Sequence, residues 1–189
     1  MRWAVLYARS RQVPVAAAGL VAVVVGVWLL YRNSWSVLPA SLAITGGVAI
    51  AAIGLSGQDV DLDRTAAIRW PVRRLAHLLL IGVVTGVLVL AAQQLGGSPV
   101  DTWLVVRNSA GVLGLAGLAA TLAGGHFGWT LPLFWFAVAV VVPESADPPV
   151  RTQVVAWMLQ PGDSAPANWT AMVAAMVGLV AYTWSGGRK

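Results

Sequence analysis

Long apolar segments separated by short polar ones make up most of this chain and predict membrane-spanning helices. A helix that crosses a bilayer needs about twenty predominantly apolar residues. We expect six such spans, at residues 13–30, 37–55, 75–95, 103–123, 129–142 and 169–184. The predicted fold class is therefore all-α: one polytopic transmembrane domain covering residues 1–189, with six helices.

Three other segments are more polar or more broken. Residues 1–12 combine arginines with Trp3, Leu6 and Tyr7, a short basic amphipathic pattern suited to the headgroup level, although a frayed basic terminus would look the same. Residues 57–74 carry three aspartates and four arginines, so they cannot lie in hydrocarbon. Residues 143–168 contain five prolines and little charge, which predicts an irregular loop.

The segment 57–74 contains the pattern of a short helix. Asp63 is a candidate N-cap and Pro71 a candidate stop, because proline cannot donate a hydrogen bond to the preceding turn. A helix acidic at its start and basic at its end also suits its own dipole. The residues that a soluble partner could contact there are Asp63, Arg64, Ala67, Ile68, Arg69 and Trp70. The alternative is an ordinary solvated loop.

Within residues 143–168, four apolar side chains recur at helical spacing: Val150, Val154, Trp157 and Met158. The run ends at Pro161 and Gly162, and it is too short to span a bilayer. It should be a re-entrant or interfacial helix, which is tolerated at membrane depth only where protein shields its backbone ends.

The fourth predicted span differs from the others in two ways. It carries Arg107 near one end, where we expect the side chain to extend to the headgroups. It also contains Gly111, Gly114 and Gly117, which keep part of the helix surface flat. Flat surfaces let helix backbones approach closely, so these glycines predict a tight contact with another helix.

Composition and charge agree with this topology. The chain is 58% hydrophobic and only 10% charged, where soluble domains carry roughly a quarter charged residues. Of its twelve Lys and Arg residues, nine lie on one predicted face, which holds both termini and the loop 57–74. The positive-inside rule makes that face cytoplasmic. Orientation therefore explains the net charge of +5 better than nucleic-acid binding does.

Recognisable catalytic chemistry is missing. All seven acidic residues fall in predicted loops, so no proton or ion relay is visible within the spans. The two histidines have no partner at metal-ligand spacing, and the chain has no cysteine. A phosphate-binding glycine loop is absent as well. We expect neither an enzyme nor a bound cofactor or metal, and any energy for transport would have to enter from another subunit.

This layout resembles the six-helix permeases of ABC exporters. Those proteins have an amphipathic helix before the first span, a cytoplasmic coupling helix between the second and third, and short external re-entrant helices between the fifth and sixth. The matching stretches here are MRWAVLYARSR, DLDRTAAIRWPVRR and VRTQVVAWMLQPG. The stretches DRTAAIRWPVRRLAHLLL and WTLPLFWF also resemble sequences of small actinobacterial membrane proteins described as ABC transporter permeases.

The resemblance implies a permease subunit in a bacterial cytoplasmic membrane. Two permease chains, identical or homologous, would form the substrate path, and separate ATP-binding subunits would bind ATP and magnesium. This chain is short for the family, with thin fifth and sixth spans, which leaves open whether it translocates substrate or is an accessory subunit. A non-transporting membrane scaffold or assembly factor of the same topology is the alternative.

Overall fold

The computed structural model describes residues 13–55, 70–96, 98–143 and 145–185, and every regular element within them is a helix. In chain order these are α2 (Val13–Tyr31), α3 (Val37–Ala52), the 3₁₀ turn η1 (Ile53–Leu55), α5 (Trp70–Gln93), α6 (Thr102–Ala123), the 3₁₀ turn η2 (Gly125–Phe127), α7 (Thr130–Val141), α8 (Val150–Val155), the 3₁₀ turn η3 (Trp157–Leu159) and α9 (Ala165–Ser185).

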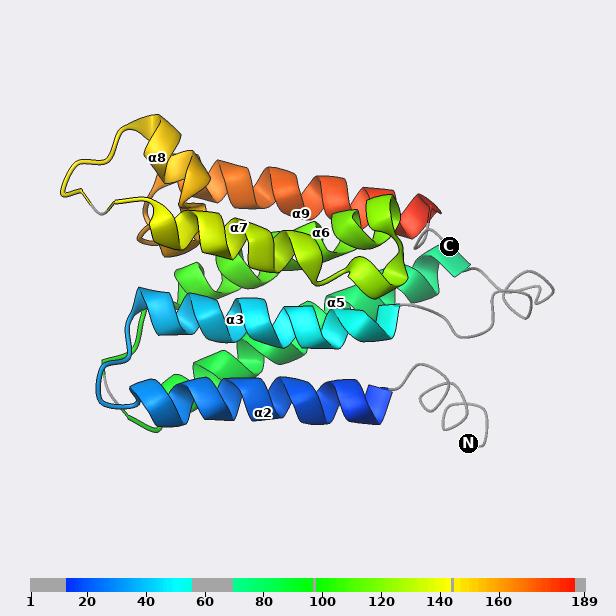
Figure 1. Ribbon diagram of the computed structural model, residues 1–189, viewed down its shortest axis with the longest axis horizontal. Coiled ribbons are helices and arrows are strands. Elements are labelled where there is room, and N and C mark those ends of the chain that lie inside the picture. Colours follow the sequence, from blue (N-terminus) through cyan, green and yellow to red (C-terminus); the bar gives the residue numbers. More distant parts are fainter. Residues whose placement is uncertain (1–12, 56–69, 97, 144, 186–189) are drawn as a thin grey trace.

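The longer helices run back and forth along one common direction, as Figure 1 shows. α6 and α9 begin at one end, which we call the Arg107 end, and α8 lies there too. At the opposite end α2, α5 and α7 begin and α9 finishes. A hydrogen bond from Tyr182 Oη to the Leu55 carbonyl oxygen (3.2 Å) joins α9 to η1 at this opposite end.

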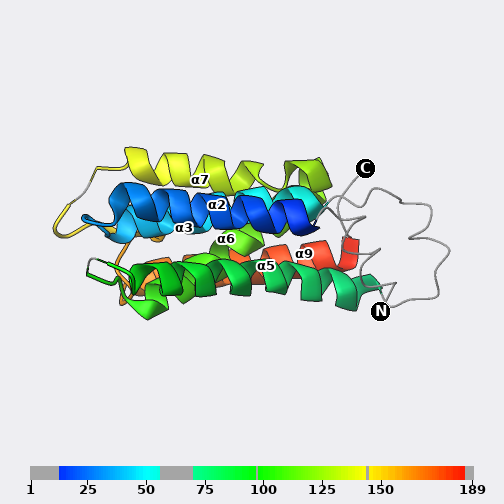
Figure 2. The same ribbon diagram turned by 90° about the horizontal axis from the view of Figure 1, so that it is seen from below.

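α6 is the central helix of the bundle. Of its residues in the candidate span, 78% are buried, against 17% for α2. Seen along the other direction, α6 lies between a layer that contains α7, α2 and α3 and a layer that contains α5 and α9 (Figure 2). A helix surrounded in this way must be apolar or small on nearly every side, which suits the glycine- and alanine-rich sequence of α6.

Four of the helices are long and apolar enough to cross a membrane: α2, α5, α6 and α9. α3 and α7 are apolar but shorter, with 16 and 12 residues. The chain is therefore an all-helical protein whose four long apolar helices indicate association with a membrane. The two shorter helices occupy the second and fifth predicted spans.

Two helix boundaries differ from the prediction. Pro71 does not end a helix; it lies in the first turn of α5, where its missing N–H removes no intrahelical bond. Residues 70–74 therefore belong to α5 and not to a separate loop. α9 begins at Ala165, four residues before the predicted span, so the predicted loop 143–168 is shorter than expected. Pro166 is tolerated in that first turn for the same reason.

The ends of α6 have clear local causes. The Asp101 carboxylate accepts a hydrogen bond from the Trp103 backbone N–H (3.1 Å), which caps the first turn. At the other end Gly124 adopts a φ of 109°, which a residue with a side chain rarely adopts, and so ends the helix.

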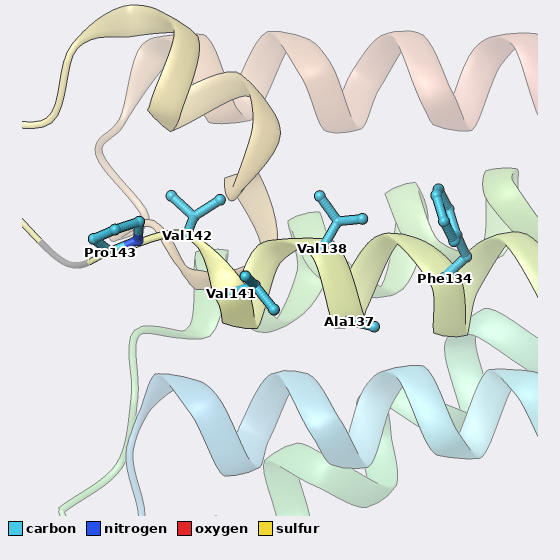
Figure 3. Close-up of a pocket in the computed structure, with 6 residues that line it drawn as sticks. All are labelled: Phe134, Ala137, Val138, Val141, Val142 and Pro143. Carbon is cyan, nitrogen blue, oxygen red and sulfur yellow. The ribbon is translucent and has the colours of Figure 1, made fainter.

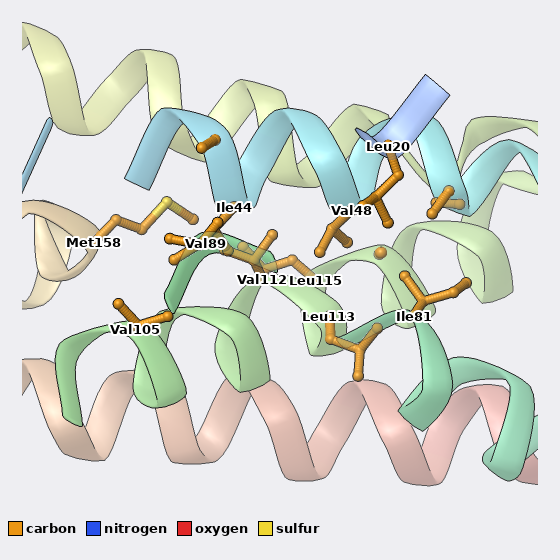
Figure 4. Packing of buried hydrophobic residues seen from close by; sticks show 14 of the residues in the cluster. Leu20, Ile44, Val48, Ile81, Val89, Val105, Val112, Leu113, Leu115 and Met158 are labelled. Atoms are coloured by element: carbon orange, nitrogen blue, oxygen red, sulfur yellow. The ribbon is translucent and has the colours of Figure 1, made fainter. Parts of the chain in front are cut away.

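One hydrophobic cluster connects the helices. It contains Ile44 and Val48 from α3, Val89 from α5 and Val112 from α6, all fully buried. Met158 from η3 enters the same cluster from the Arg107 end (Figure 4). Trp157 and Met158 thus anchor the segment between α7 and α9 in the core.

Candidate functional site

The most distinctive feature of the structure is the segment 150–161, which folds into the bundle between α7 and α9. We call it the docked segment. It consists of α8, η3 and the following Gln160 and Pro161. α8 ends at Val155, and the chain turns at Ala156 into η3. Trp157 and Met158 of η3 are fully buried inside the bundle.

Arg107 on α6 holds this segment with its whole guanidinium group. Nη2 donates to the carbonyl oxygens of Trp157 (3.0 Å) and Gln160 (2.7 Å). Nη1 donates to the Pro161 carbonyl (2.8 Å) and to Asn168 Oδ1 (3.3 Å). Nε donates to Asn108 Oδ1 (3.0 Å). All five guanidinium N–H groups are therefore used, and each acceptor is a neutral oxygen.

The predicted extension of Arg107 to the headgroups is wrong. The side chain is 4% exposed and points to the docked segment. The physical reason is that the last carbonyls of a short helical segment have no intrahelical partner. A cation at this end satisfies them and complements the local dipole. Arg107 thus caps η3 from a neighbouring helix.

Asn108 extends the same network to α3. Its Nδ2 donates to Ser41 Oγ (2.9 Å) and to the Met158 carbonyl (2.7 Å). Ser41 Oγ donates to that carbonyl as well (2.7 Å). Asn168 on α9 donates through Nδ2 to the carbonyl of Gly162 (3.0 Å), the residue that follows the docked segment. Side chains from α3, α6 and α9 therefore converge on carbonyl groups of this segment and of the residue after it. We call Ser41, Arg107, Asn108 and Asn168 the carbonyl clamp.

Sequence reasoning did not select Ser41, Asn108 or Asn168 as site residues. The available signal was their position: each is a polar residue next to or within an apolar helix, where a polar side chain needs a partner. Their partners could not be read from the sequence because they lie far away along the chain. Ser41 and Met158, for example, are separated by 117 residues.

The four apolar residues predicted for this segment separate into two pairs. Trp157 and Met158 are buried, whereas Val150 and Val154 on α8 are exposed. The segment consists of two short helical pieces, α8 and η3, where the sequence predicts a single run at helical spacing. The helix ends at Val155, and the change of direction at Ala156 breaks the helical spacing on which the expectation depended. α8 is held instead by Trp135 Nε1, which donates to the Val155 carbonyl (2.9 Å).

The three glycines of α6 lie where its neighbours approach most closely. A Cβ atom added to Gly114 would be 2.5 Å from the Cα of Ala175 on α9, and one added to Gly117 would be 2.9 Å from the Gly178 carbonyl oxygen. A Cβ added to Gly111 would be 2.5 Å from the Trp157 ring. The glycines thus serve two contacts, with α9 and with the docked segment.

The residues predicted to contact a soluble partner cannot be placed in the same way. Asp63, Arg64, Ala67, Ile68 and Arg69 lie outside the described residues. Trp70 is the first residue of α5, so it belongs to that long helix. Within the described chain, no group of three His, Asp or Glu side chains could hold a metal ion.

A shallow apolar depression lies on the outer surface of α7 and is separate from the carbonyl clamp. Its lining comes only from the second half of α7 and the residues that follow, from Phe134 to Pro143 (Figure 3). With no polar group to orient a ligand, it lacks the usual character of a specific binding site.

The arrangement as a whole holds a short, turned segment among the longer helices. The clamp supplies hydrogen-bond donors to backbone carbonyls at the end of η3, where those of Trp157 and Pro161 also accept from the backbone N–H groups of Gln160 (3.4 Å) and Ser164 (3.2 Å). Comparison with family models, curated proteins and solved structures finds no match to this chain.

Proposed function

We propose that this protein is the permease subunit of an ATP-driven exporter, crossing a bacterial cytoplasmic membrane six times. One observation supports this above the others: a short segment between α7 and α9 folds back among the helices and is held there by Arg107. The exporter permeases that the sequence resembles carry re-entrant helices in the corresponding place. ATP and magnesium would bind to a partner subunit, and a second permease chain would complete the substrate path.

The proposed orientation puts the Arg107 end outside the cell. The cytoplasmic side then holds residues 1–12, 57–69 and 186–189. The charge distribution supports this orientation, because nine of the twelve Lys and Arg residues lie on that face. In this orientation the docked segment and the carbonyl clamp lie at the external side of the membrane.

Reporter fusions test the orientation. A reporter fused after residue 65 or after Lys189 should be active only as a cytoplasmic reporter, and one inserted beside Asp147 only as an external one. Asp147 is exposed at the Arg107 end, so an insertion there leaves the bundle intact. A cytoplasmic signal at Asp147 would contradict the three predicted spans between it and residue 65, and with them the proposed count of six.

The coupling function is assigned to residues 63–70. In this proposal Arg64 and Arg69 contact an acidic groove on the ATP-binding subunit, while Ala67, Ile68 and Trp70 provide the apolar part of the contact. Asp63 caps the helix, and its replacement by alanine typically costs about 1 kcal/mol of helix stability. Closure of the ATP-binding subunits would then be transmitted to α3 and α5, the helices on either side.

Charge reversal tests this assignment. Arg64→Glu with Arg69→Glu should release the ATP-binding subunit during gentle extraction and uncouple its ATP hydrolysis from substrate. The matched control is Arg188→Glu with Lys189→Glu, which changes the net charge equally on the same predicted face and should leave the complex intact. If no ATPase co-purifies with the unmodified protein, the permease proposal fails.

The scaffold alternative is favoured by a different observation. The contact between α6 and α9 is closely packed around Gly114, and the apolar depression on α7 lies on the outside of the bundle. A protein that only holds partners together in the membrane needs no path through its centre. Co-purification with membrane proteins other than an ATP-binding subunit, and normal export in cells lacking this chain, would support the scaffold.

A further inference from the structure

We propose that water enters the contact between α5 and α6 from the Arg107 end and reaches as far as Ser109. We call this contact the α5–α6 seam. The ligand is water, held inside a bundle of apolar helices. This water site depends on no ATP-binding partner; only the statement that it opens outside the cell rests on the proposed function.

α5 and α6 are antiparallel neighbours in a defined register. A Cβ atom added to Gly82 on α5 would lie 2.7 Å from Leu113 Cδ2 on α6, and one added to Gly86 would lie 3.1 Å from Ser109 Oγ. Because α6 begins at the Arg107 end, Ser109 lies about one turn nearer to that end than Leu113. The seam thus changes from a close apolar contact at Leu113 to a polar one at Ser109.

Ser109 carries a hydroxyl group that is buried without a partner. The residue is 6% exposed, and its Oγ makes no hydrogen bond to any residue that the structure describes. Thr85, on the same seam, bonds instead to its own helix: its Oγ1 donates to the Ile81 carbonyl oxygen one turn back (2.8 Å). Ser109 Oγ makes no such bond and lies beside Gly86 on the neighbouring helix.

The small size of Gly86 leaves space beside this hydroxyl. Apart from Gly86, its two neighbours and the nearby α5 backbone, the described structure has only Ser109 atoms within 4 Å of a Cβ added there: Oγ at 3.1 Å and Cβ at 3.6 Å. Buried waters in proteins bond to polar groups that the chain leaves unpaired, and each needs room for a single molecule. Ser109 provides the polar group and Gly86 the space.

A second unpaired group marks the outer end of the seam. Gln93 is seven positions after Gly86 on the buried face of α5 and is 2% exposed. Its Nε2 donates to the Val100 carbonyl oxygen (3.4 Å), which leaves Oε1 as a buried acceptor without a partner in the described chain. Trp35 provides a matching donor, because it is 4% exposed and its Nε1 has no partner among the described residues either.

The turns beside Trp35 and Gln93 touch each other. Gly96 follows Gln93 in the chain, and a Cβ added to Gly96 would lie 3.6 Å from the carbonyl oxygen of Arg32. An indole N–H can donate to water, and water can donate to an amide oxygen. Water at this end would therefore pair Trp35 with Gln93 and connect the outside of the bundle with the space at Ser109.

Leu113 closes the inner end of the seam. Its side chain is 3% exposed and lies against Gly82. The next contact inward, between Leu78 and Gly117, is apolar as well. In the proposed orientation the water therefore comes from outside the cell and stops at Ser109. The site is a recess open to external water and not a path through the bundle.

Silver ions test this inference, because the chain has no cysteine of its own and a single thiol can be introduced. Ser109→Cys exchanges one oxygen for sulfur, and Leu113→Cys puts a thiol one turn deeper in the same seam. Val83→Cys is the control on the outer surface of α5, where the residue is 61% exposed. Silver is small and enters water but not hydrocarbon, and it binds the thiolate, whose formation apolar surroundings suppress. The intact protein is studied in right-side-out membrane vesicles in chloride-free buffer, and the remaining thiols are measured with a fluorescent maleimide after denaturation.

The thiol of Ser109→Cys should react about tenfold faster than those of Leu113→Cys and Val83→Cys. Equal rates at positions 109 and 113 would overturn the inference and leave the proposed function intact. Adding Gly86→Ala to Ser109→Cys should slow the reaction, and an unchanged rate would overturn the placement of water at Gly86. A reaction at position 109 in inside-out vesicles alone would contradict the proposed orientation, and with it the proposed function, while the water site would stand.

Ser109→Ala provides a second measurement that needs no thiol. A hydroxyl bonded to water contributes to stability, whereas a dry hydroxyl without a partner lowers it. The water site therefore predicts a lower denaturant midpoint for Ser109→Ala than for the unmodified protein in detergent micelles. A higher or unchanged midpoint would overturn the inference.

Discussion

Replacing Arg107 with methionine should lower the free energy of unfolding by an amount on the order of 3 kcal/mol. Methionine has a similar length but no donor, so the carbonyls of Trp157, Gln160 and Pro161 and the two asparagine oxygens would lose their bonds to the guanidinium. A buried acceptor without a partner costs more than a normal hydrogen bond contributes. Denaturant titration in detergent micelles measures the change.

The same substitution should release the docked segment. We expect faster amide hydrogen exchange and new protease cleavage between residues 150 and 161. Arg151→Met is the matched control, because Arg151 is exposed on α8 and the chemical change is identical. Its effect should be small. Equal effects of the two substitutions would show that Arg107 does not hold the segment.

Gly114→Ala, which adds one methyl group, should lower the free energy of unfolding by an amount that is also on the order of 3 kcal/mol. The new Cβ would overlap the backbone of Ala174 and Ala175, and backbone atoms cannot move aside as a flexible side chain can. α6 and α9 would have to separate, and the larger Gly114→Leu change should separate them further. Thermal unfolding in micelles provides the measurement.

Gly26→Ala is the control for that experiment. Gly26 lies in the middle of α2, and a Cβ added there would meet no atom within 4 Å. Because alanine has a higher helix propensity than glycine, this variant should be neutral or more stable by up to about 1 kcal/mol. If both variants behaved alike, the close approach of α6 and α9 would not be the reason for glycine at position 114.

The helices themselves follow from local sequence, so most of their positions could be predicted. The start of α6 depends on Asp101 and its end on Gly124, and both signals are within a few residues of the boundary. The prediction failed at Pro71 because a proline can either end one helix or begin the next. The sequence around Pro71 is compatible with both.

The carbonyl clamp could not be predicted because its contacts join distant parts of the chain. Arg107 meets residues of the docked segment that lie 50 and 53 positions further along the chain, and nothing near Arg107 indicates that several carbonyl groups lie within reach. Headgroups were the expected partner because an isolated helix end offers no other. The glycines of α6 were easier to interpret: small residues indicate a close contact, although the sequence alone does not show that α9 makes it.

The position of the clamp has a consequence for the order of assembly during synthesis. α6 is complete about forty residues before α9 begins, yet α9 and the docked segment supply its closest backbone contact and most acceptors of Arg107. A nascent chain that has reached only α7 therefore carries a charged, glycine-rich helix that still lacks α9 and the docked segment. Its guanidinium must stay in contact with water or headgroups until the ribosome has made residue 168. We therefore expect burial of Arg107 to be a late event, completed only when α9 and the docked segment pack against α6.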